Sequence, residues 1–370
     1  MDRIQTGIKK AGDFYGMKKN APIIQMEFGY YCMERWILEG HIKEGDDLSQ
    51  LFGFDAPGTY SLGGLGWCEA AFCPGFEEEV IEDRGKYELV RDFAGRHVLF
   101  FKGRRDGFMP EYVAHPVTDW DSWERDVKWR LAPASKGRFD DTVNTLIEAE
   151  KFASMGGVIV QNLIGGYMYL RSLVGPEGIL YMVYDDPALV HDMMQTWFDL
   201  ADAVVSRHQQ SVTLDEIYLA EDICYNCGPL ISPDMMREFL FPYYQQLISN
   251  AKKRQIDPSR KLFIQIDTDG DCRPVIPVYQ EIGMNYMSPF EVASNCDVVA
   301  LRKEYPELLM RGGIDKRILA AGREAISREV DRIMPFMKEQ GGYTPTCDHG
   351  VPPEVNFEDY MYYRELMKAF

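Results

Sequence analysis

The sequence predicts an α/β fold, a (β/α)8 or TIM barrel with an irregular N-terminal insertion. From residue 141 onward, strand-like and helix-like segments alternate, and such alternation implies right-handed crossovers and a parallel sheet. The strand candidates are short and apolar without clean polar alternation, which is typical of strands buried on both faces. Seven candidates fit an eight-stranded barrel in which one strand escapes recognition. An open doubly wound sheet is the alternative, but no GxGxxG fingerprint follows the first strand.

Each expected element has a local signal. Helices are expected where apolar residues recur three or four apart, as in residues 189–204, 236–247, 326–333 and 360–367. Asp186-Pro187 and Ser232-Pro233 each supply an N-cap and a proline at the first helical position. The strand candidates, all rich in Ile, Leu, Val, Phe or Tyr, span residues 22–28, 157–163, 216–221, 261–267, 284–288, 307–312 and 342–346.

The whole chain, residues 1–370, is predicted to form a single domain. Residues 60–135 are less regular, carry many aromatic residues and include a hairpin-like stretch, 87–101. We therefore expect them to form an insertion between the first strand and the regular alternation.

The composition excludes several classes of protein. The chain is 46% hydrophobic and 26% charged over 370 residues, as expected for a globular protein. No apolar run approaches the roughly 20 residues that cross a membrane, and Met1 is not followed by a signal-peptide core, so a cytoplasmic protein is expected. The formal net charge of −18 argues against a nucleic-acid partner, which needs a basic surface.

The eight cysteines are predicted to be free thiols, because a cytosolic chain of this length seldom relies on disulfides. Cys224 and Cys227 have CxxC spacing, but no second pair is present to complete a zinc site. We expect them to lie in a loop before a helix.

Carboxylates end or follow nearly every predicted strand, and a parallel barrel collects these ends on one face. Asp271 and Asp315 suit helix capping. The others would repel each other unless a cation, a shared proton or a positive group is present, which favours a metal site or a general acid of raised pKa. His349, in a rigid turn after the last strand, is expected to be functional. The residues at the strand ends are Glu27, Tyr30, Tyr31, Gln161, Asn162, Glu221, Asp222, Asp267, Asp269, Asp271, Glu291, Asp315, Cys347, Asp348 and His349.

At these positions the chain resembles the uroporphyrinogen decarboxylase-like superfamily, from about residue 20 to its end. This superfamily includes the decarboxylase of haem synthesis and corrinoid-dependent methyltransferases, and its members are (β/α)8 barrels. The segments that carry the resemblance are Glu221-Asp222 with the downstream stretch 228–233, Gln265-Ile-Asp267, Gly312-Gly-Ile-Asp315 and the stretch 348–353.

Departures from the family pattern distinguish its branches. The decarboxylase grips porphyrinogen carboxylates with arginines of its N-terminal segment, whereas residues 24–31 here contain Glu27 and no arginine. The coenzyme M methyltransferases hold zinc with a His-x-Cys pair and a later Cys, and those places here are Gln265, Asp267 and His349. Such side chains suit zinc, Mg²⁺, Mn²⁺ or Ca²⁺, or no metal at all with an Asp as general acid.

The resemblance therefore implies a methyltransferase of the O-demethylase type, which takes a methyl group from a small donor such as an aryl methyl ether. The acceptor would be a corrinoid (methylcobalamin) on a partner carrier protein, with zinc or another divalent metal as the expected ion. Asp267, Glu221 and His349 are the expected catalytic residues, and the expected metal ligands are these three with Asp269. The expected substrate-binding residues are Tyr30, Tyr31, Asn162, Gln265 and Glu291.

Two alternatives stay open. One is uroporphyrinogen decarboxylase or a related decarboxylase of a polycarboxylate, which needs arginines at the mouth, with Arg104, Arg105, Arg171 and Arg311 as the candidates. The other is a non-catalytic barrel that binds a corrinoid or a small molecule. The sequence leaves open the donor, the carrier and the oligomeric state, a homodimer included.

Overall fold

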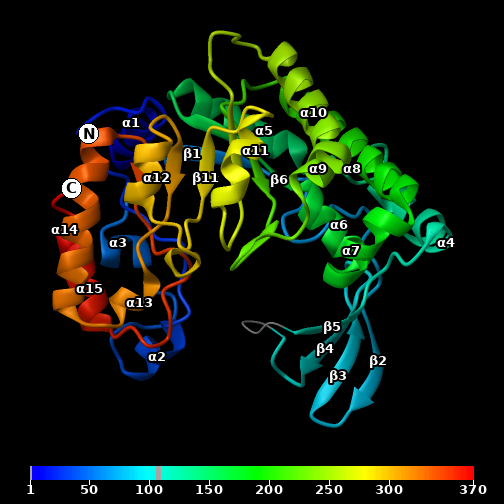
Figure 1. Cartoon of the computed structure of the whole chain (residues 1–370), viewed down its shortest axis with the longest axis horizontal. Coiled ribbons are helices and arrows are strands. Elements are labelled where there is room, and N and C mark those ends of the chain that lie inside the picture. Colours follow the sequence, from blue (N-terminus) through cyan, green and yellow to red (C-terminus); the bar gives the residue numbers. More distant parts are fainter. Residues whose placement is uncertain (1, 106–109) are drawn as a thin grey trace.

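The computed structural model describes residues 2–105 and 110–370, and its centre is a parallel sheet of seven strands (Figure 1). Both edge strands line the same cavity, so the sheet is curled as in part of a barrel. All six neighbouring pairs are parallel. In sheet order the strands are β1 (Thr59–Leu62), β6 (Val158–Ile164), β7 (Glu216–Ala220), β10 (Phe263–Asp267), β11 (Tyr286–Ser288), β12 (Leu309–Arg311) and β13 (Tyr343–Thr344).

Six of the seven expected strands are confirmed, but the expectation for residues 22–28 is wrong. This segment is extended without a strand ladder, because its backbone groups have other partners. The Gln25 amide donates to Asp55 Oδ2 at 2.7 Å, and the Ile23 amide donates to the carbonyl of Phe370. Conversely, β1 was missed because it is only four residues long, and it had been counted in the insertion.

Residues 22–28 and the residues just after them contact segments that adjoin the two edge strands, β1 and β13. Asp55, just before β1, donates its amide to the carbonyl of Gln25. On the other side, Tyr30 forms a parallel bridge with Val351, which follows β13. The described residues thus form a curled seven-stranded parallel sheet, where the sequence had suggested a closed barrel of eight.

Side chains alternate between the two faces of each strand. On β7 and β10, Ile217 and Ile264 are buried on the outer face, which the helices cover. Glu216, Tyr218 and Gln265 point to the inner face and line the cavity. The polar residues of these strands are therefore gathered inside the curl.

The helices lie outside the sheet, with α8 and α10 on one side and α14 and α15 on the other (Figure 1). The predicted caps are confirmed, since Asp186 accepts from the amide of Leu189 and Ser232 from that of Met235. A π-helical turn over Met236–Leu240 joins α9 to α10. The helices are α1 (Arg3–Tyr15), α2 (Met33–Leu38), α3 (Leu48–Phe52), α4 (Trp120–Ser122), α5 (Thr142–Ser154), α6 (Gly166–Val174), α7 (Pro176–Asp185), α8 (Pro187–His208), α9 (Pro233–Met235), α10 (Phe241–Arg254), α11 (Ile276–Gln280), α12 (Val298–Glu304), α13 (Lys316–Leu319), α14 (Arg323–Gln340) and α15 (Phe357–Met367).

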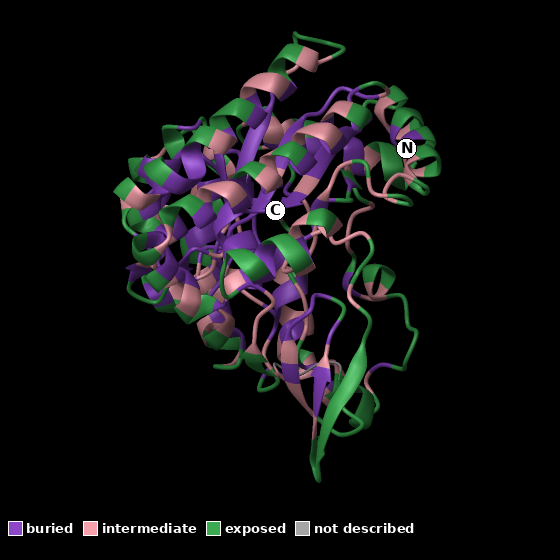
Figure 2. Ribbon diagram, turned by 90° about the vertical axis from the view of Figure 1, so that its right-hand side faces the viewer, coloured by how far each residue is buried: buried purple, intermediate pink, exposed green. Residues whose placement is uncertain are grey.

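The insertion forms a four-stranded antiparallel sheet that projects from the body (Figure 1). The expected hairpin over residues 87–101 is confirmed. Much of this sheet is exposed, in contrast with the buried strands of the body (Figure 2). The insertion, expected to begin at residue 60, begins after β1, because residues 60–62 belong to the central sheet. Residues 106–109 of the insertion lie outside the described part of the chain. Its strands are β2 (Glu79–Arg84), β3 (Tyr87–Arg91), β4 (His97–Phe101) and β5 (Glu111–Ala114).

Helix α1 lies against the segment that leads into β1, and two glycines allow the close approach. A Cβ at Gly7 would lie 2.0 Å from the carbonyl oxygen of Ala56, and one at Gly58 would lie 2.3 Å from the carbonyl oxygen of Gly7. Phe14 and Tyr15 of this helix line the cavity. Helix α1 therefore forms part of the cavity wall.

All eight cysteines are free, as predicted. Cys224 lies in a two-residue strand, β8 (Cys224–Tyr225), which pairs with β9 (Gly228–Pro229). Within the part of the chain that the structure describes, none of the helices has the length and apolar character needed to cross a bilayer.

Candidate active site

A cavity of about 490 Å³ lies inside the curled sheet. This volume falls within the range of small-molecule sites, roughly 300–1,000 Å³. Trp67 of the insertion reaches its wall, so the insertion contributes to the site. The polar and aromatic side chains used below are Asn162, Glu216, Tyr218, Gln265, Tyr286 and Arg311.

Asp267 is the last residue of β10, at the carboxyl edge of the sheet, as predicted. It accepts a hydrogen bond from the Ser288 hydroxyl, and the Arg311 guanidinium lies 3.8 Å from its Oδ2. Loss of hydration raises the pKa of Asp267 to about 6, against the opposing effect of Arg311. A carboxyl group with this pKa can hold or release a proton near neutral pH, which suits general acid chemistry.

Gln265 links Asp267 to a second carboxyl group deeper in the cavity. The amide orientation that satisfies its neighbours has its nitrogen donating to Glu216 Oε1 at 2.5 Å. Its oxygen then lies 2.7 Å from the Ser288 hydroxyl oxygen and accepts from Arg311 at 3.2 Å. Glu216 also accepts from the Tyr15 hydroxyl of α1. Burial raises the pKa of Glu216 to about 7.

His349, in the turn after β13, lies beside Asp269, Tyr31 and Phe28. Its Nε2 is 3.6 Å from Asp269 Oδ2, and its Nδ1 is 3.1 Å from the Tyr31 hydroxyl. Its ring stacks on Tyr31 at 5.7 Å and contacts Phe28. The contact with Asp269 raises the pKa of His349, and partial burial opposes this rise. The structure thus brings together three of the predicted site residues, His349, Asp269 and Tyr31.

The turn that carries His349 is held by its buried neighbours. Asp348 accepts from the amides of Val292 and Lys316, at 2.9 and 3.0 Å. The Cys347 amide donates to Glu27 at 2.7 Å, and burial raises the pKa of the Cys347 thiol well above its usual range. Cys347 is therefore a poor nucleophile in this setting, and Asp348 and Glu27 have structural roles.

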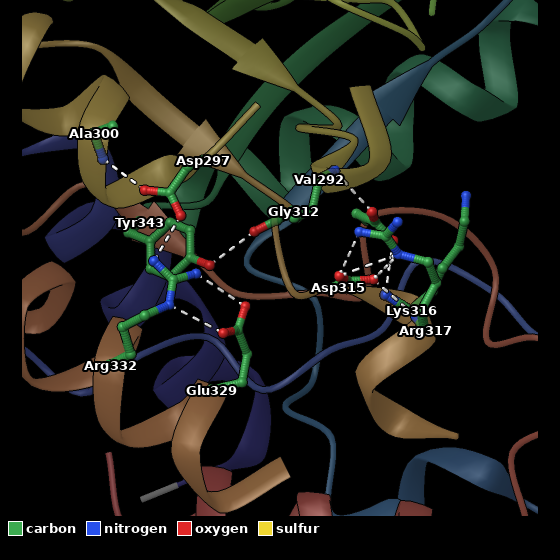
Figure 3. A network of polar contacts seen from close by, with 11 residues as sticks. Val292, Asp297, Ala300, Gly312, Asp315, Lys316, Arg317, Glu329, Arg332 and Tyr343 are labelled. Carbon is green, nitrogen blue, oxygen red and sulfur yellow. Dashed lines mark hydrogen bonds and ion pairs between the residues drawn. The ribbon is translucent and has the colours of Figure 1, made fainter. Parts of the chain in front are cut away.

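The loop after β12 is braced in the same region (Figure 3). The Tyr343 hydroxyl of β13 donates to the carbonyl of Gly312 at 2.8 Å. Asp315 accepts from the amide of Arg317 and pairs with its guanidinium, which confirms Asp315 as the predicted cap of α13. This bracing fixes Lys316, which follows the cap.

Other carboxylates at the mouth pair with cations, which answers the repulsion noted in the sequence. Lys316 Nζ lies 3.1 Å from Glu291, whose other oxygen accepts from the Gly270 amide. Arg171 lies 2.7 Å from Asp222. Glu291, predicted as a substrate-binding residue, is therefore already paired and does not line the cavity.

Of the predicted site residues, Asn162 and Gln265 line the cavity, whereas Glu221 and Tyr30 are held elsewhere inside the protein. Glu221 is fully buried, where it accepts from the Tyr244 hydroxyl at 2.5 Å and the Tyr167 amide at 3.0 Å. Tyr30 packs against Trp36 and donates to or accepts from the Tyr360 hydroxyl at 2.8 Å. Both residues serve packing, because their polar atoms are already engaged inside the protein.

The buried position of Glu221 predicts a pH-dependent stability. Burial raises the pKa of Glu221 from its ordinary value of 4.5 to about 7, with Tyr244 opposing the rise. Between these values the unfolded chain ionises this group and the folded chain does not, so rising pH favours unfolding. The contribution is full below about pH 4.5 and is lost as pH rises through about 7, by about 3 kcal/mol.

Urea unfolding at pH 5 and pH 8 measures this contribution. We expect the free energy of unfolding of Glu221→Gln minus that of wild type to be about 2.5 kcal/mol larger at pH 8 than at pH 5, because the amide cannot ionise. An equal difference at the two pH values would show that Glu221 is ionised in the folded protein.

The four predicted metal ligands do not form one site. Glu221 is enclosed by Tyr244, Asp267 faces Arg311, and only Asp269 and His349 lie together. Across residues 2–105 and 110–370, no group of three or more His, Cys, Asp or Glu side chains is placed to hold a metal ion. These residues therefore do not fit a bound metal in this arrangement, and a guanidinium supplies the positive charge beside Asp267.

A family model described as uroporphyrinogen decarboxylase (URO-D) matches residues 158–370, more than half of the chain. The chain belongs to the uroporphyrinogen decarboxylase family. It is 24% identical over 191 residues to uroporphyrinogen decarboxylase of Alcanivorax borkumensis, covering 48% of this chain and 47% of that protein. It is also 24% identical over 240 residues to that of Saccharopolyspora erythraea, covering 61% and 62%. The chain thus spans about half to three-fifths of the length of these relatives.

Among solved structures, a methyltransferase from Methanosarcina mazei superposes with a TM-score of 0.59 and 13% identity. The match covers 98% of this chain and 99% of that one, so the two share a fold over their whole length. The resemblance to the uroporphyrinogen decarboxylase-like superfamily, inferred from the sequence, is confirmed.

In this member of the uroporphyrinogen decarboxylase family, sequence reasoning missed Glu216, Tyr218 and Ser288, and it considered Arg311 only for decarboxylation. All four belong to strands of the inner wall or contact Gln265 and Asp267. Their signal was present as polar residues two apart in otherwise apolar strands, such as Glu216-Ile-Tyr218. The mostly apolar composition of the strands hid this two-residue period.

Proposed function

We propose that this protein is a methyltransferase that moves a methyl group from a small methylated donor, such as an aryl methyl ether, to a corrinoid on a partner carrier protein. The observation that carries the proposal is Asp267, a carboxyl group of raised pKa beside the cavity and next to Arg311. The carrier protein, the corrinoid and a homodimeric assembly are all parts of the proposal.

In the proposed reaction the bond between the methyl carbon and the donor oxygen breaks, and the oxygen keeps the electron pair. Asp267 donates its proton to that oxygen, so the leaving group departs as a neutral alcohol or phenol. The corrinoid, as the second substrate, supplies the nucleophile that accepts the methyl group. Proton transfer from a positioned acid contributes roughly 10²–10⁴-fold to such a step.

The cavity wall suits a flat donor. Trp67, Tyr218 and Tyr286 supply aromatic surface, and Asn162 and Gln265 supply amide groups that can orient the donor oxygen. His349 and Asp269, which lie 3.6 Å apart, provide a second site that can carry a proton. Asn162 and Gln265 thus keep the substrate-binding role expected from the sequence, as part of the proposal.

Decarboxylation of uroporphyrinogen or another polycarboxylate is the second candidate, because the curated relatives are uroporphyrinogen decarboxylases and Arg311 lines the cavity. The four candidate arginines already lie next to carboxylates of this chain, at 3.9, 2.8, 2.7 and 3.8 Å for Arg104, Arg105, Arg171 and Arg311. A polycarboxylate would have to displace these partners, which favours the methyltransferase.

The two functions can be separated in parallel assays. The purified protein is mixed with a reduced corrinoid carrier and a panel of methylated donors, and methylcobalamin formation is followed by absorption spectroscopy. In the second assay uroporphyrinogen is supplied, and coproporphyrinogen is measured. We expect methylcobalamin with at least one donor and no coproporphyrinogen. Coproporphyrinogen formation without methyl transfer would overturn the proposal in favour of the decarboxylase.

A further inference from the structure

Glu216 and Asp267 lie at the two ends of an unbroken hydrogen-bonded chain. The chain runs from Glu216 through the Gln265 amide and the Ser288 hydroxyl to Asp267. Each contact in it is 2.7 Å or shorter. Contacts this short between polar atoms require a hydrogen between them, so the hydrogens along the chain can be counted.

One arrangement of hydrogens leaves the proton on Asp267. If the Gln265 nitrogen donates to Glu216, its oxygen faces Ser288 at 2.7 Å and must accept the Ser288 hydrogen. That hydroxyl has only one hydrogen. The contact between Ser288 and Asp267 then needs a hydrogen from the carboxyl group, so Asp267 is protonated and Glu216 is ionised.

The opposite arrangement leaves the proton on Glu216. If the Gln265 nitrogen donates to Ser288 at 2.7 Å, its oxygen faces Glu216 and must accept a hydrogen from that carboxyl group. The Ser288 hydroxyl is then free to donate to Asp267, which is ionised. Both arrangements hold one proton; they differ in which carboxyl group carries it and by a half-turn of the Gln265 amide, and the second places the Gln265 nitrogen 3.2 Å from the Arg311 donor.

The charges around this hydrogen-bonded chain favour a state in which Glu216 and Asp267 together hold one proton over a state in which both are ionised. Arg311 is the guanidinium that acts on both Asp267 and Glu216. With both carboxyl groups ionised, one cation would face two buried anions. The other groups near them are Tyr15 of α1, Tyr218 of β7, Tyr286 of β11, Asp269 after β10, and Asp215, which pairs with Arg260.

We propose that Glu216 and Asp267 share a single proton through Gln265 and Ser288, and that Glu216 is the positioning residue that keeps this proton on Asp267. The Tyr15 hydroxyl stabilises the ionised form of Glu216 and so favours the state in which Asp267 is the acid. The catalytic use of that proton rests on the proposed function, whereas the sharing itself does not.

Infrared titration tests the sharing without any substrate. The carboxyl band of Asp267 is identified as the one lost in Asp267→Asn, and its pH midpoint is measured in wild type and in Glu216→Gln. Removing the charge at position 216 leaves Arg311 facing one carboxyl group, so we expect the midpoint of Asp267 to fall by at least one pH unit, a tenfold change in the protonation ratio. Glu221→Gln is the matched control, because Glu221 is equally buried but does not belong to the hydrogen-bonded chain. This variant should leave the pH midpoint of Asp267 unchanged.

The reciprocal measurement keeps the proposal testable if Glu216→Gln fails to fold. The carboxyl band of Glu216 should shift to lower pH in Asp267→Asn by a similar amount, because the coupling is mutual. If each group titrates at the same pH with and without the other, the two do not share a proton. Should wild type transfer no methyl group at all, the proposed function fails while the infrared result still decides the sharing.

Discussion

Asparagine in place of Asp267 should lower kcat/KM for methyl transfer by roughly 10²–10⁴-fold, the usual contribution of a positioned general acid. The amide keeps the shape of the side chain and can still contact Ser288 and Arg311, but it has no acidic proton for the leaving oxygen. Steady-state kinetics with the best donor from the panel measures this loss.

The pH profile identifies the cause of the loss. Burial raises the pKa of Asp267 to about 6, and the active form is the protonated one, so wild-type kcat/KM should fall as pH rises through about 6. Asp267→Asn should lack this limb. Asp257→Asn is the control, because Asp257 is an exposed acid in the loop between α10 and β10 that contacts Ser259. A profile that stays flat around pH 6 in wild type would contradict the role given to Asp267.

Alanine in place of Gly7 should destabilise the protein by about 3 kcal/mol, within the usual cost of overpacking. The new Cβ would lie 2.0 Å from the carbonyl oxygen of Ala56. This oxygen is a backbone atom, so the clash cannot be relieved by rotating a side chain. Helix α1 would have to move away from the segment before β1, and Tyr15 would move with it. Urea unfolding at pH 5, monitored by circular dichroism, measures the change.

Gly12→Ala is the matched control on the same helix, because nothing lies within 4 Å of a Cβ there. Alanine is the better helix former, so this variant should gain up to about 1 kcal/mol. If both variants were stabilised, α1 would not be packed as closely as the structure has it.

Much of the fold followed from local patterns in the sequence. The strands from residue 157 onward and the caps at Asp186, Ser232 and Asp315 were predictable, because each depends on short-range chemistry. Residues 22–28 have strand-like composition, but the partners of their amides are an aspartate side chain and the end of the chain. Such partners are distant in sequence, so composition alone could not reveal that no ladder forms.

The site was predicted in part. Asn162 and Gln265 line the cavity, Asp267 is linked to Gln265 through Ser288, and His349 lies next to Asp269, because strand ends place them there. Glu221 also follows a strand, yet it turns toward Tyr244 and the start of α6 rather than toward the cavity. The direction in which a strand-end side chain turns depends on tertiary packing, which the sequence pattern does not contain.

The close packing of α1 has a consequence for acidity at the other end of the cavity. Tyr15 is the only hydroxyl of this helix that donates to Glu216 among the described contacts. Whenever α1 opens locally, Glu216 loses that donor and holds a proton more tightly, so under the proposed sharing Asp267 gives its proton up. The docking equilibrium of one N-terminal helix would then regulate the fraction of molecules that carry the proton on Asp267, and a substitution at Gly7 or Gly58 would shift it.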